Sequence, residues 1–109
     1  MMTFEEYSLQ SSKVLLYPKD IAPLYLALGI NGEAGEVGEK VKKVYRDLKG
    51  EFTDECKLEI KKEIGDVLWY LNRLCEELGF TLQESAELNV IKLEDRIRRD
   101  VLQKSGDNR

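Results

Sequence analysis

Apolar residues recur at helical spacing along two long stretches of the chain. They occur at steps of three and four positions between residues 26 and 48, with one step of seven from Ile30 to Val37, and again at steps of three and four between residues 60 and 78. This spacing places side chains on one face of an α-helix, and no stretch shows the alternation of a β-strand. The apolar positions are Leu26, Ile30, Val37, Val41, Val44 and Leu48 in the first stretch, and Ile60, Ile64, Val67, Leu71, Leu74 and Leu78 in the second. The sequence therefore predicts an all-α fold.

Capping signals predict the first and last of four helices. A Thr-x-x-Glu capping box occurs at residues 3–6 and again at residues 81–84. Each box satisfies two backbone N–H groups that have no partner within the helix, which is typical of a helix start. We expect the first helix to run to about Leu16, because Pro18 forces the residue before it out of helical geometry. We expect the fourth helix to end near Leu102.

The two long stretches predict the second and third helices. Asp20 is a candidate N-cap for the second helix, which should continue to about Leu48. Thr53 or the next residue should open the third helix, and Gly79 should follow its end at Leu78 as a left-handed cap. Together the four helices predict one domain.

Four glycines lie inside the second predicted helix, at Gly29, Gly32, Gly35 and Gly38. Each weakens a helix interior by roughly 0.5 to 1 kcal/mol relative to alanine. Two interpretations stay open from the sequence. The helix breaks near residues 29–32, or the missing side chains let another backbone or a ligand approach closely.

Two pairs of acids fall within the predicted apolar faces. Glu33 and Glu63 interrupt the two stripes, and Glu36 and Asp66 follow them by three residues. An unpaired carboxylate in such a position costs several kcal/mol, so it takes up a proton, pairs with a cation or binds a metal. If the two helices pack together, the four carboxylates converge. This arrangement predicts a metal site on a helical hairpin.

The composition narrows the chemistry of such a site. The chain has no histidine, which excludes Ser-His-Asp, Cys-His and histidine-containing zinc or di-iron sites. Cys56 and Cys75 are nineteen positions apart and form no C-x-x-C motif, so neither a zinc site nor a redox dithiol is indicated. Oxygen ligands alone suit Mg²⁺, with Mn²⁺ as a substitute, and Mg²⁺ typically completes its shell with waters and substrate phosphates.

Length and charge set further limits. A chain of 109 residues is expected to form one domain, here residues 1–104, with a frayed tail over residues 105–109. A net charge of −4 and a pI near 5.0 argue against nucleic-acid binding. No apolar run reaches the ~18 residues of a membrane span, and the N-terminus does not look like a signal peptide. We therefore expect a cytoplasmic protein that does not bind membranes.

Three short motifs occur along the chain in a recognisable order. They are Gly-Glu-Ala-Gly-Glu at residues 32–36, Glu-Ile-Gly-Asp-Val-Leu at residues 63–68, and Asn-Val-Ile-Lys-Leu at residues 89–93 followed by Arg96. With the 26 residues between the first two acid motifs, this pattern resembles the MazG-like nucleotide pyrophosphohydrolases of the all-α NTP pyrophosphatase superfamily. The resemblance covers roughly residues 22–97. It implies a four-helix, MazG-like bundle completed by oligomerisation, as a homodimer or homotetramer.

The resemblance also implies a reaction. Glu33, Glu36, Glu63 and Asp66 would coordinate Mg²⁺, with Glu36 and Glu63 as the catalytic residues. A nucleoside triphosphate, ribo or deoxy, would be cleaved between its α and β phosphates to a nucleoside monophosphate and pyrophosphate. Such an activity would serve house-cleaning or control of nucleotide pools. The chemistry agrees with the residues, because metal ions neutralise a triphosphate and lower the pKa of a bound water.

The last motif is expected to contact the substrate. Asn89, Lys92 and Arg96 share one face of the fourth predicted helix, and the resemblance makes Lys92 and Arg96 candidates for phosphate binding and Asn89 for contacts with metal or sugar. The sequence departs from the family after Arg96, where residues 97–100 continue the helix in place of a Tyr-Pro turn. Two other functions stay open: a non-catalytic module that binds nucleotide or metal, and a purely structural helical oligomer.

Overall fold

The fold is a long helical hairpin with one short helix across it and one helix leading away. The computed structural model describes residues 1–99, and none of these residues is in a β-strand. The predicted all-α class is confirmed. The elements are α1 (Phe4–Ser11), the 3₁₀ turn η1 (Lys19–Ile21), α2 (Ala22–Asp47), α3 (Asp54–Glu77) and α4 (Leu82–Arg98).

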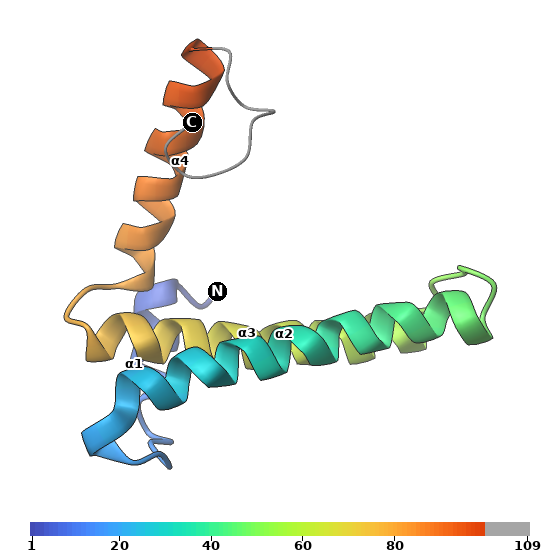
Figure 1. Ribbon diagram of the computed structural model, residues 1–109, viewed down its shortest axis with the longest axis horizontal. Coiled ribbons are helices and arrows are strands. Elements are labelled where there is room, and N and C mark those ends of the chain that lie inside the picture. The colour runs from blue at the N-terminus through green and yellow to red at the C-terminus, as the bar shows by residue number, and fades with distance from the viewer. Residues whose placement is uncertain (100–109) are drawn as a thin grey trace.

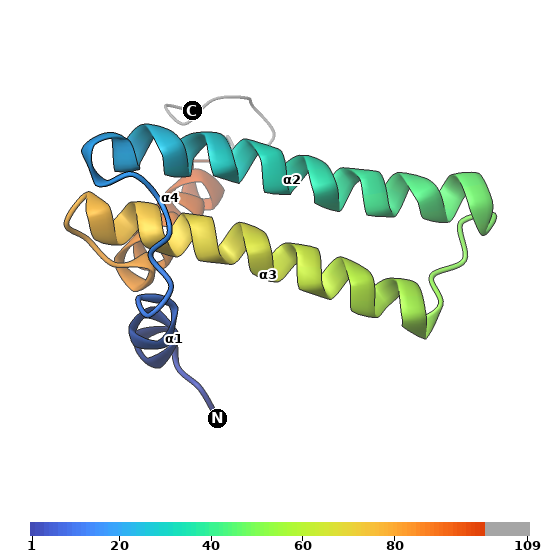
Figure 2. The ribbon, with the colours of Figure 1, turned by 90° about the horizontal axis from the view of Figure 1, so that it is seen from below.

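The hairpin consists of α2 and α3, which run antiparallel and side by side along their lengths (Figures 1 and 2). α1 crosses α3 near the open end of the hairpin, and α4 leaves from the same end and rises away from it (Figure 1). None of the described helices is long and apolar enough to span a membrane.

The buried core lies at the open end of the hairpin. Tyr17, Ala22 and Leu26 form its centre, and both Ala22 and Leu26 are fully buried. Partly buried apolar side chains surround this centre: Leu15, Trp69, Tyr70 and Leu74. Near the other end of the hairpin, Val44 is also buried, at 2 % exposure. The hairpin is therefore packed at both ends of the stretch that carries the acid pairs.

Most of the predicted helix boundaries are confirmed. Both capping boxes are present, at Thr3 and at Thr81. The Thr53 side chain accepts a hydrogen bond from the backbone of Cys56 and caps α3. Gly79 follows α3 with a φ of +86°, a left-handed conformation that glycine adopts without strain.

The first helix is shorter than predicted, because it ends at Ser11 and not near Leu16. The Ser11 hydroxyl donates to the carbonyl of Ser8, and the Ser12 hydroxyl donates to the carbonyl of Leu9. Serine hydroxyls that bond to nearby carbonyls compete with the helical hydrogen-bond pattern. The proline therefore follows the end of the helix and does not cause it.

The structure also decides three further points about the helices. Asp20 does not cap α2, because it lies inside the turn η1 and the N-cap position belongs to Ile21, which makes no side-chain cap. α2 does not break near residues 29–32. The last helix, α4, ends at Arg98, before the predicted end at residue 102. Residue 102 and the predicted tail lie outside the described residues.

The predicted apolar face of α3 is only partly correct. Ile60, Val67 and Leu74 are partly buried, as expected, but Ile64 is 54 % exposed and Leu78 is 53 % exposed. A step of four residues from Ile60 moves a side chain around the helix by about 40°. Ile64 therefore lies about 40° around α3 from Ile60, at the exposed edge of the face that packs against α2.

α4 is an arm with much exposed apolar surface. Among residues 1–99 it contacts α3 and α1, and none of its contacts is with α2. Four large apolar side chains on it are more than half exposed: Leu88, Val90, Ile91 and Ile97. Within residues 1–99, α4 therefore does not pack along α2 in a closed bundle.

Glu77, in the last turn of α3, holds the segment that leads into α2. Its carboxylate accepts a hydrogen bond of 2.5 Å from the Tyr17 hydroxyl and one of 3.0 Å from the Lys19 ammonium. These two bonds, that from Tyr17 first, hold the pKa of Glu77 below its ordinary value of 4.5. Because the native state favours the charged carboxylate, this contribution to stability is present above pH 4.5 and is lost as the pH falls through the lowered pKa.

We predict that Glu77→Gln destabilises the protein at pH 7 by about 1 to 3 kcal/mol, because hydrogen bonds to a charged group are replaced by weaker ones. The difference from the wild type should shrink below pH 4.5. Urea unfolding followed by circular dichroism at pH 7 and pH 3.5 tests this, with the exposed acid Glu94→Gln as the control. A gap that stays constant with pH would contradict the assignment.

Candidate functional site

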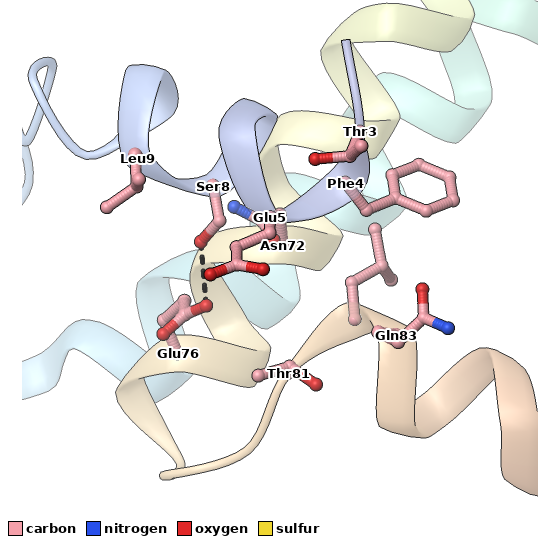
Figure 3. Close-up of a pocket in the computed structure, with 10 residues that line it drawn as sticks. Thr3, Phe4, Glu5, Ser8, Leu9, Asn72, Glu76, Thr81 and Gln83 are labelled. Carbon is pink, nitrogen blue, oxygen red and sulfur yellow. Dashed lines mark hydrogen bonds between the residues drawn. The ribbon is translucent and has the colours of Figure 1, made fainter.

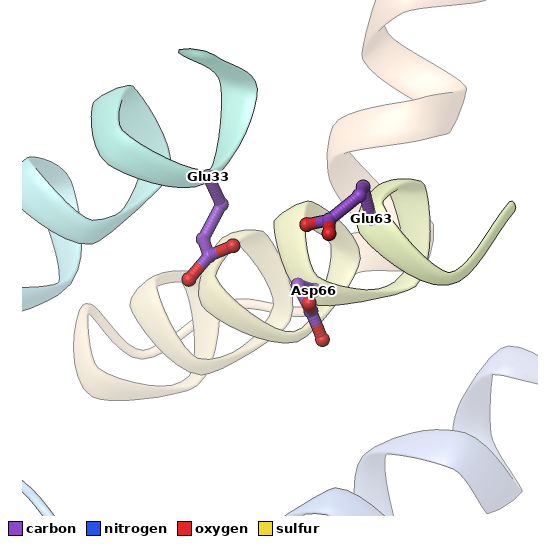
Figure 4. A group of neighbouring side chains, drawn as sticks. All are labelled: Glu33, Glu63 and Asp66. Atoms are coloured by element: carbon purple, nitrogen blue, oxygen red, sulfur yellow. The ribbon is translucent and has the colours of Figure 1, made fainter. Parts of the chain in front are cut away.

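Three carboxylates meet in the middle of the hairpin. Glu33 comes from α2, and Glu63 and Asp66 come from successive turns of α3, so that the two helices face each other with acids (Figure 4). One oxygen from each residue lies within 4.8 Å of one oxygen from each of the other two. This is about the span between opposite oxygen ligands of a divalent ion that binds them at ~2.1 to 2.6 Å. We call Glu33, Glu63 and Asp66 the acid trio.

The acid trio has no cationic partner among residues 1–99, where none of its members forms a hydrogen bond or an ion pair. Glu33 and Glu63 are partly buried and Asp66 is exposed. The pKa of Glu33 is raised above its ordinary value of 4.5, first because burial disfavours the charged carboxylate and then because Asp66, Glu63 and Glu36 are negative. The group is therefore short of positive charge.

The structure does not bring Glu36 into the trio. Glu36 is exposed and its carboxylate is not among the three that cluster. A step of three residues turns an α-helix by about 300°, so Glu36 lies about 60° around α2 from Glu33. It stands at the rim, one turn away along the same helix, and its predicted role as a metal ligand and catalytic residue stays a prediction.

The substrate-binding candidates on α4 also lie apart from the trio. Asn89 lies near the middle of α4, and Lys92 and Arg96 lie in its C-terminal half; the helix extends away from the hairpin (Figure 1). Asn89 is exposed, Lys92 is partly buried and Arg96 is 4 % exposed. Within the described part of this single chain, these residues and the acid trio are not assembled into one site.

Residues 22–99 match the MazG nucleotide pyrophosphohydrolase domain. This match spans α2, α3 and α4, and thus includes the whole acid trio. The chain belongs to the MazG nucleotide pyrophosphohydrolase family. It is also 39 % identical over 114 residues to the Gene 37 protein of Mycobacterium phage L5, a match that covers 99 % of this chain and 100 % of the phage protein. That name states no activity. No solved structure matches the chain.

Sequence reasoning missed two tyrosines beside the acids of this MazG chain. Tyr70 packs between the helices, and its pKa is raised first by burial and then by Tyr25, Glu33 and Asp66. On α1, the pKa of Tyr7 is raised by burial first and by Asp66 second. The three motifs of the sequence assign no role to Tyr70. Its position four residues after Asp66 was the signal that placed it on the same helix face.

A separate cavity of about 540 Å³ lies where α1, the end of α3 and the start of α4 meet (Figure 3). Ser8 and Glu76 line it and form a hydrogen bond of 2.7 Å across it. No member of the acid trio lines this cavity. The trio is the better candidate for chemistry in this MazG domain, because three carboxylates cluster there. In the cavity, Glu76 already accepts a hydrogen bond from Ser8.

The trio fits a divalent cation by its donor set. Three carboxylates and no nitrogen or sulfur ligand are typical of Mg²⁺ and Mn²⁺ sites. The raised pKa of Glu33 has a defined consequence for folding. Because the native state binds a proton more readily than the unfolded chain, the charged carboxylate reduces stability above the raised pKa, and stability increases as the pH falls toward 4.5.

We predict opposite effects of Glu33→Gln with and without metal. In chelator at pH 7 the variant should melt above the wild type, since like-charge repulsion is relieved, and the difference should vanish as the pH falls below 4.5. With Mg²⁺ at 100 times its dissociation constant, the wild type should gain about 2.7 kcal/mol. The variant should gain much less. Thermal melting followed by circular dichroism gives the melting temperature of the wild type and of the variant, each in chelator and in Mg²⁺.

The matched control is Glu59→Gln. Glu59 lies one turn before Glu63 on α3 and forms ion pairs with Lys62 and Lys40, so it lies outside the trio. Its substitution should leave the response to Mg²⁺ unchanged. A wild-type melting temperature that responds to neither Mg²⁺ nor Mn²⁺ would count against the metal site.

Proposed function

We propose that this protein is a metal-dependent nucleoside triphosphate pyrophosphohydrolase that converts an NTP or dNTP and water to the monophosphate and pyrophosphate. The observation that carries the proposal is the acid trio, which supplies three oxygen ligands and no counter-charge at the position of the family's acid motifs. A triphosphate is an anionic substrate, and it needs a cation to approach three carboxylates.

Glu33, Glu63 and Asp66 would hold Mg²⁺, with Mn²⁺ as a substitute. When bound, the ion supplies charge neutralisation for the phosphates and a lowered pKa for a water molecule. Glu36 stands at the rim, one turn beyond Glu33, and is available to orient the attacking water and accept its proton. Glu63, which is partly buried, would present its carboxylate from the facing helix. The nucleophile is water, the bond broken joins the α phosphorus to the bridging oxygen, and pyrophosphate leaves.

Substrate contacts from Asn89, Lys92 and Arg96 fit this proposal only if α4 of another copy approaches the hairpin. Such an assembly also explains the exposed apolar side chains of the arm. We therefore propose a homodimer, or a tetramer built from dimers, in which α4 packs against a second chain.

We predict that the wild type releases pyrophosphate, and not inorganic phosphate, from at least one member of a panel of NTPs and dNTPs in Mg²⁺. Glu63→Gln and Asp66→Asn should each lower turnover by about 100-fold or more while keeping the helical content, because each removes charge from the metal ligands. Pyrophosphate-coupled assays and circular dichroism measure the two effects. Glu59→Gln should stay active.

The alternatives give different results in the same experiment. Tight nucleotide binding without product from any member of the panel would favour a binding module. The absence of both nucleotide binding and stabilisation by Mg²⁺ or Mn²⁺ would favour a structural oligomer.

We predict that light scattering coupled to size exclusion gives at least twice the chain mass of 12.6 kDa. The double variant Ile91→Glu with Ile97→Glu should shift the protein toward the monomer, because charges on the exposed apolar arm oppose its burial in an interface. Leu58→Glu changes an exposed apolar residue near the opposite end of the hairpin and serves as the control. Dissociation by Leu58→Glu and not by the double variant would place the interface elsewhere.

A further inference from the structure

One close contact between the two long helices lies next to the acid trio. Gly29 of α2 faces the ring of Tyr70 of α3, and a Cβ atom added at residue 29 would overlap the ring carbons Cδ1, Cε1 and Cζ. The two helices approach each other here only because residue 29 has no side chain. At one of the four glycines the missing side chain thus allows a close approach, although the group that approaches is a side chain and not a backbone or a ligand.

The contact is one helical turn from the trio on both helices. Gly29 precedes Glu33 by four residues, and Tyr70 follows Asp66 by four residues. Because α2 and α3 are antiparallel, both of these steps point toward the open end of the hairpin. The separation of the helices at Gly29 and Tyr70 is therefore passed on directly to the next turn, where Glu33 faces Glu63 and Asp66.

The Tyr70 ring is held in place on its other sides. It meets the Trp69 ring edge-on, with centroids 5.0 Å apart, and it packs against the core formed around Leu26. A methyl group at residue 29 is accommodated more easily by displacement of α2 than by rotation of a packed ring.

We propose that the contact between Gly29 and Tyr70 is a positioning device that sets the gap across which Glu33 faces Glu63 and Asp66. The gap fixes whether three carboxylates on two helices reach a single divalent cation. Metal sites tolerate ligand distances only within about 0.2 Å, so a small displacement of α2 weakens binding. This inference rests on the proposed function, because it takes the trio as the metal site. Tyr70 is a positioning residue that acts through the acids.

The other helical glycines provide matched controls. A Cβ atom added at Gly32, Gly35 or Gly38 meets no atom within 4 Å among the described residues. Gly32 is adjacent to Glu33 in the sequence, so Gly32→Ala makes the same chemical change next to the same ligand without a contact to disturb. It should stabilise the helix slightly, since alanine is the better helix former.

The experiment compares the affinity of Gly29→Ala and Gly32→Ala for Mn²⁺ and Mg²⁺ by isothermal titration calorimetry, with no nucleotide present. We expect Gly29→Ala to weaken binding by about tenfold or more, the size of effect found when support of metal ligands is removed. Gly32→Ala should bind within about twofold of the wild type, since it leaves the ligands and their support unchanged.

Two variants of Tyr70 separate the ring from its hydroxyl. Tyr70→Phe keeps the ring and should bind metal within about threefold of the wild type. Tyr70→Leu should weaken binding, and adding it to Gly29→Ala should recover part of the affinity lost in Gly29→Ala, because the smaller side chain makes room for the methyl group. Such a rescue of metal affinity is not expected from a general loss of stability.

Several outcomes would overturn the inference. One is normal metal affinity in Gly29→Ala, even if it melts at a lower temperature, and another is an equal loss in Gly32→Ala or in Tyr70→Phe. If Gly29→Ala does not fold by circular dichroism, unchanged affinity in Tyr70→Leu overturns the inference instead. A wild type that binds neither cation refutes the proposed function and this inference with it, whereas binding by the wild type together with normal Gly29→Ala refutes the inference alone.

Discussion

Two helices hold three mutually repelling carboxylates close together, and the rest of the structure must offset this repulsion. Glu33 and Glu63 lie where the apolar pattern of the hairpin would otherwise continue, and the exposed Asp66 lies beside them. None of the three has a cationic partner within residues 1–99. Packing at both ends of this stretch, at Leu26 and at Val44, supplies the apolar contacts that keep the acids together. Apolar residues at the same positions would favour folding alone, and this conflict is what the metal site proposed above would account for.

The packing of α2 against α3 gives the four glycines of α2 different structural roles. α2 continues through all four, although each costs helix stability, because its pairing with α3 outweighs local propensity. Only Gly29 among those in α2 is tightly approached by another side chain in the described structure, by the ring of Tyr70. A glycine in a helix is therefore not in itself a sign of a hinge, and the neighbouring helix decides what its missing side chain does.

Much of the fold was predictable from local signals. Capping boxes and the glycine after α3 act within one turn, so the sequence alone identifies them, and the stripe of α2 correctly predicts Leu26 and Val44 as buried. The predicted end of α1 was wrong because serine side chains compete with the helical hydrogen bonds before the chain reaches the proline. In the site, the spacing of the acid motifs correctly predicts that Glu63 and Asp66 lie close to Glu33. The rotation of each helix about its axis depends on tertiary packing, which local spacing does not determine. For this reason the sequence predicted neither that Glu36 stays outside the trio nor where Tyr70 lies.

The charge balance and the packing of the single chain both concern α4. The trio needs positive charge and the proposed triphosphate would add more negative charge, while the basic residues Lys92 and Arg96 lie on α4, which leads away from the hairpin. The arm also exposes four large apolar side chains that a folded protein normally covers. One rearrangement meets both needs if a second hairpin packs against α4, because the same contact that buries Ile91 and Ile97 moves the residues around Lys92 toward acids. In the assembly proposed above, electrostatics and the hydrophobic effect would thus act together, although on different faces of the helix.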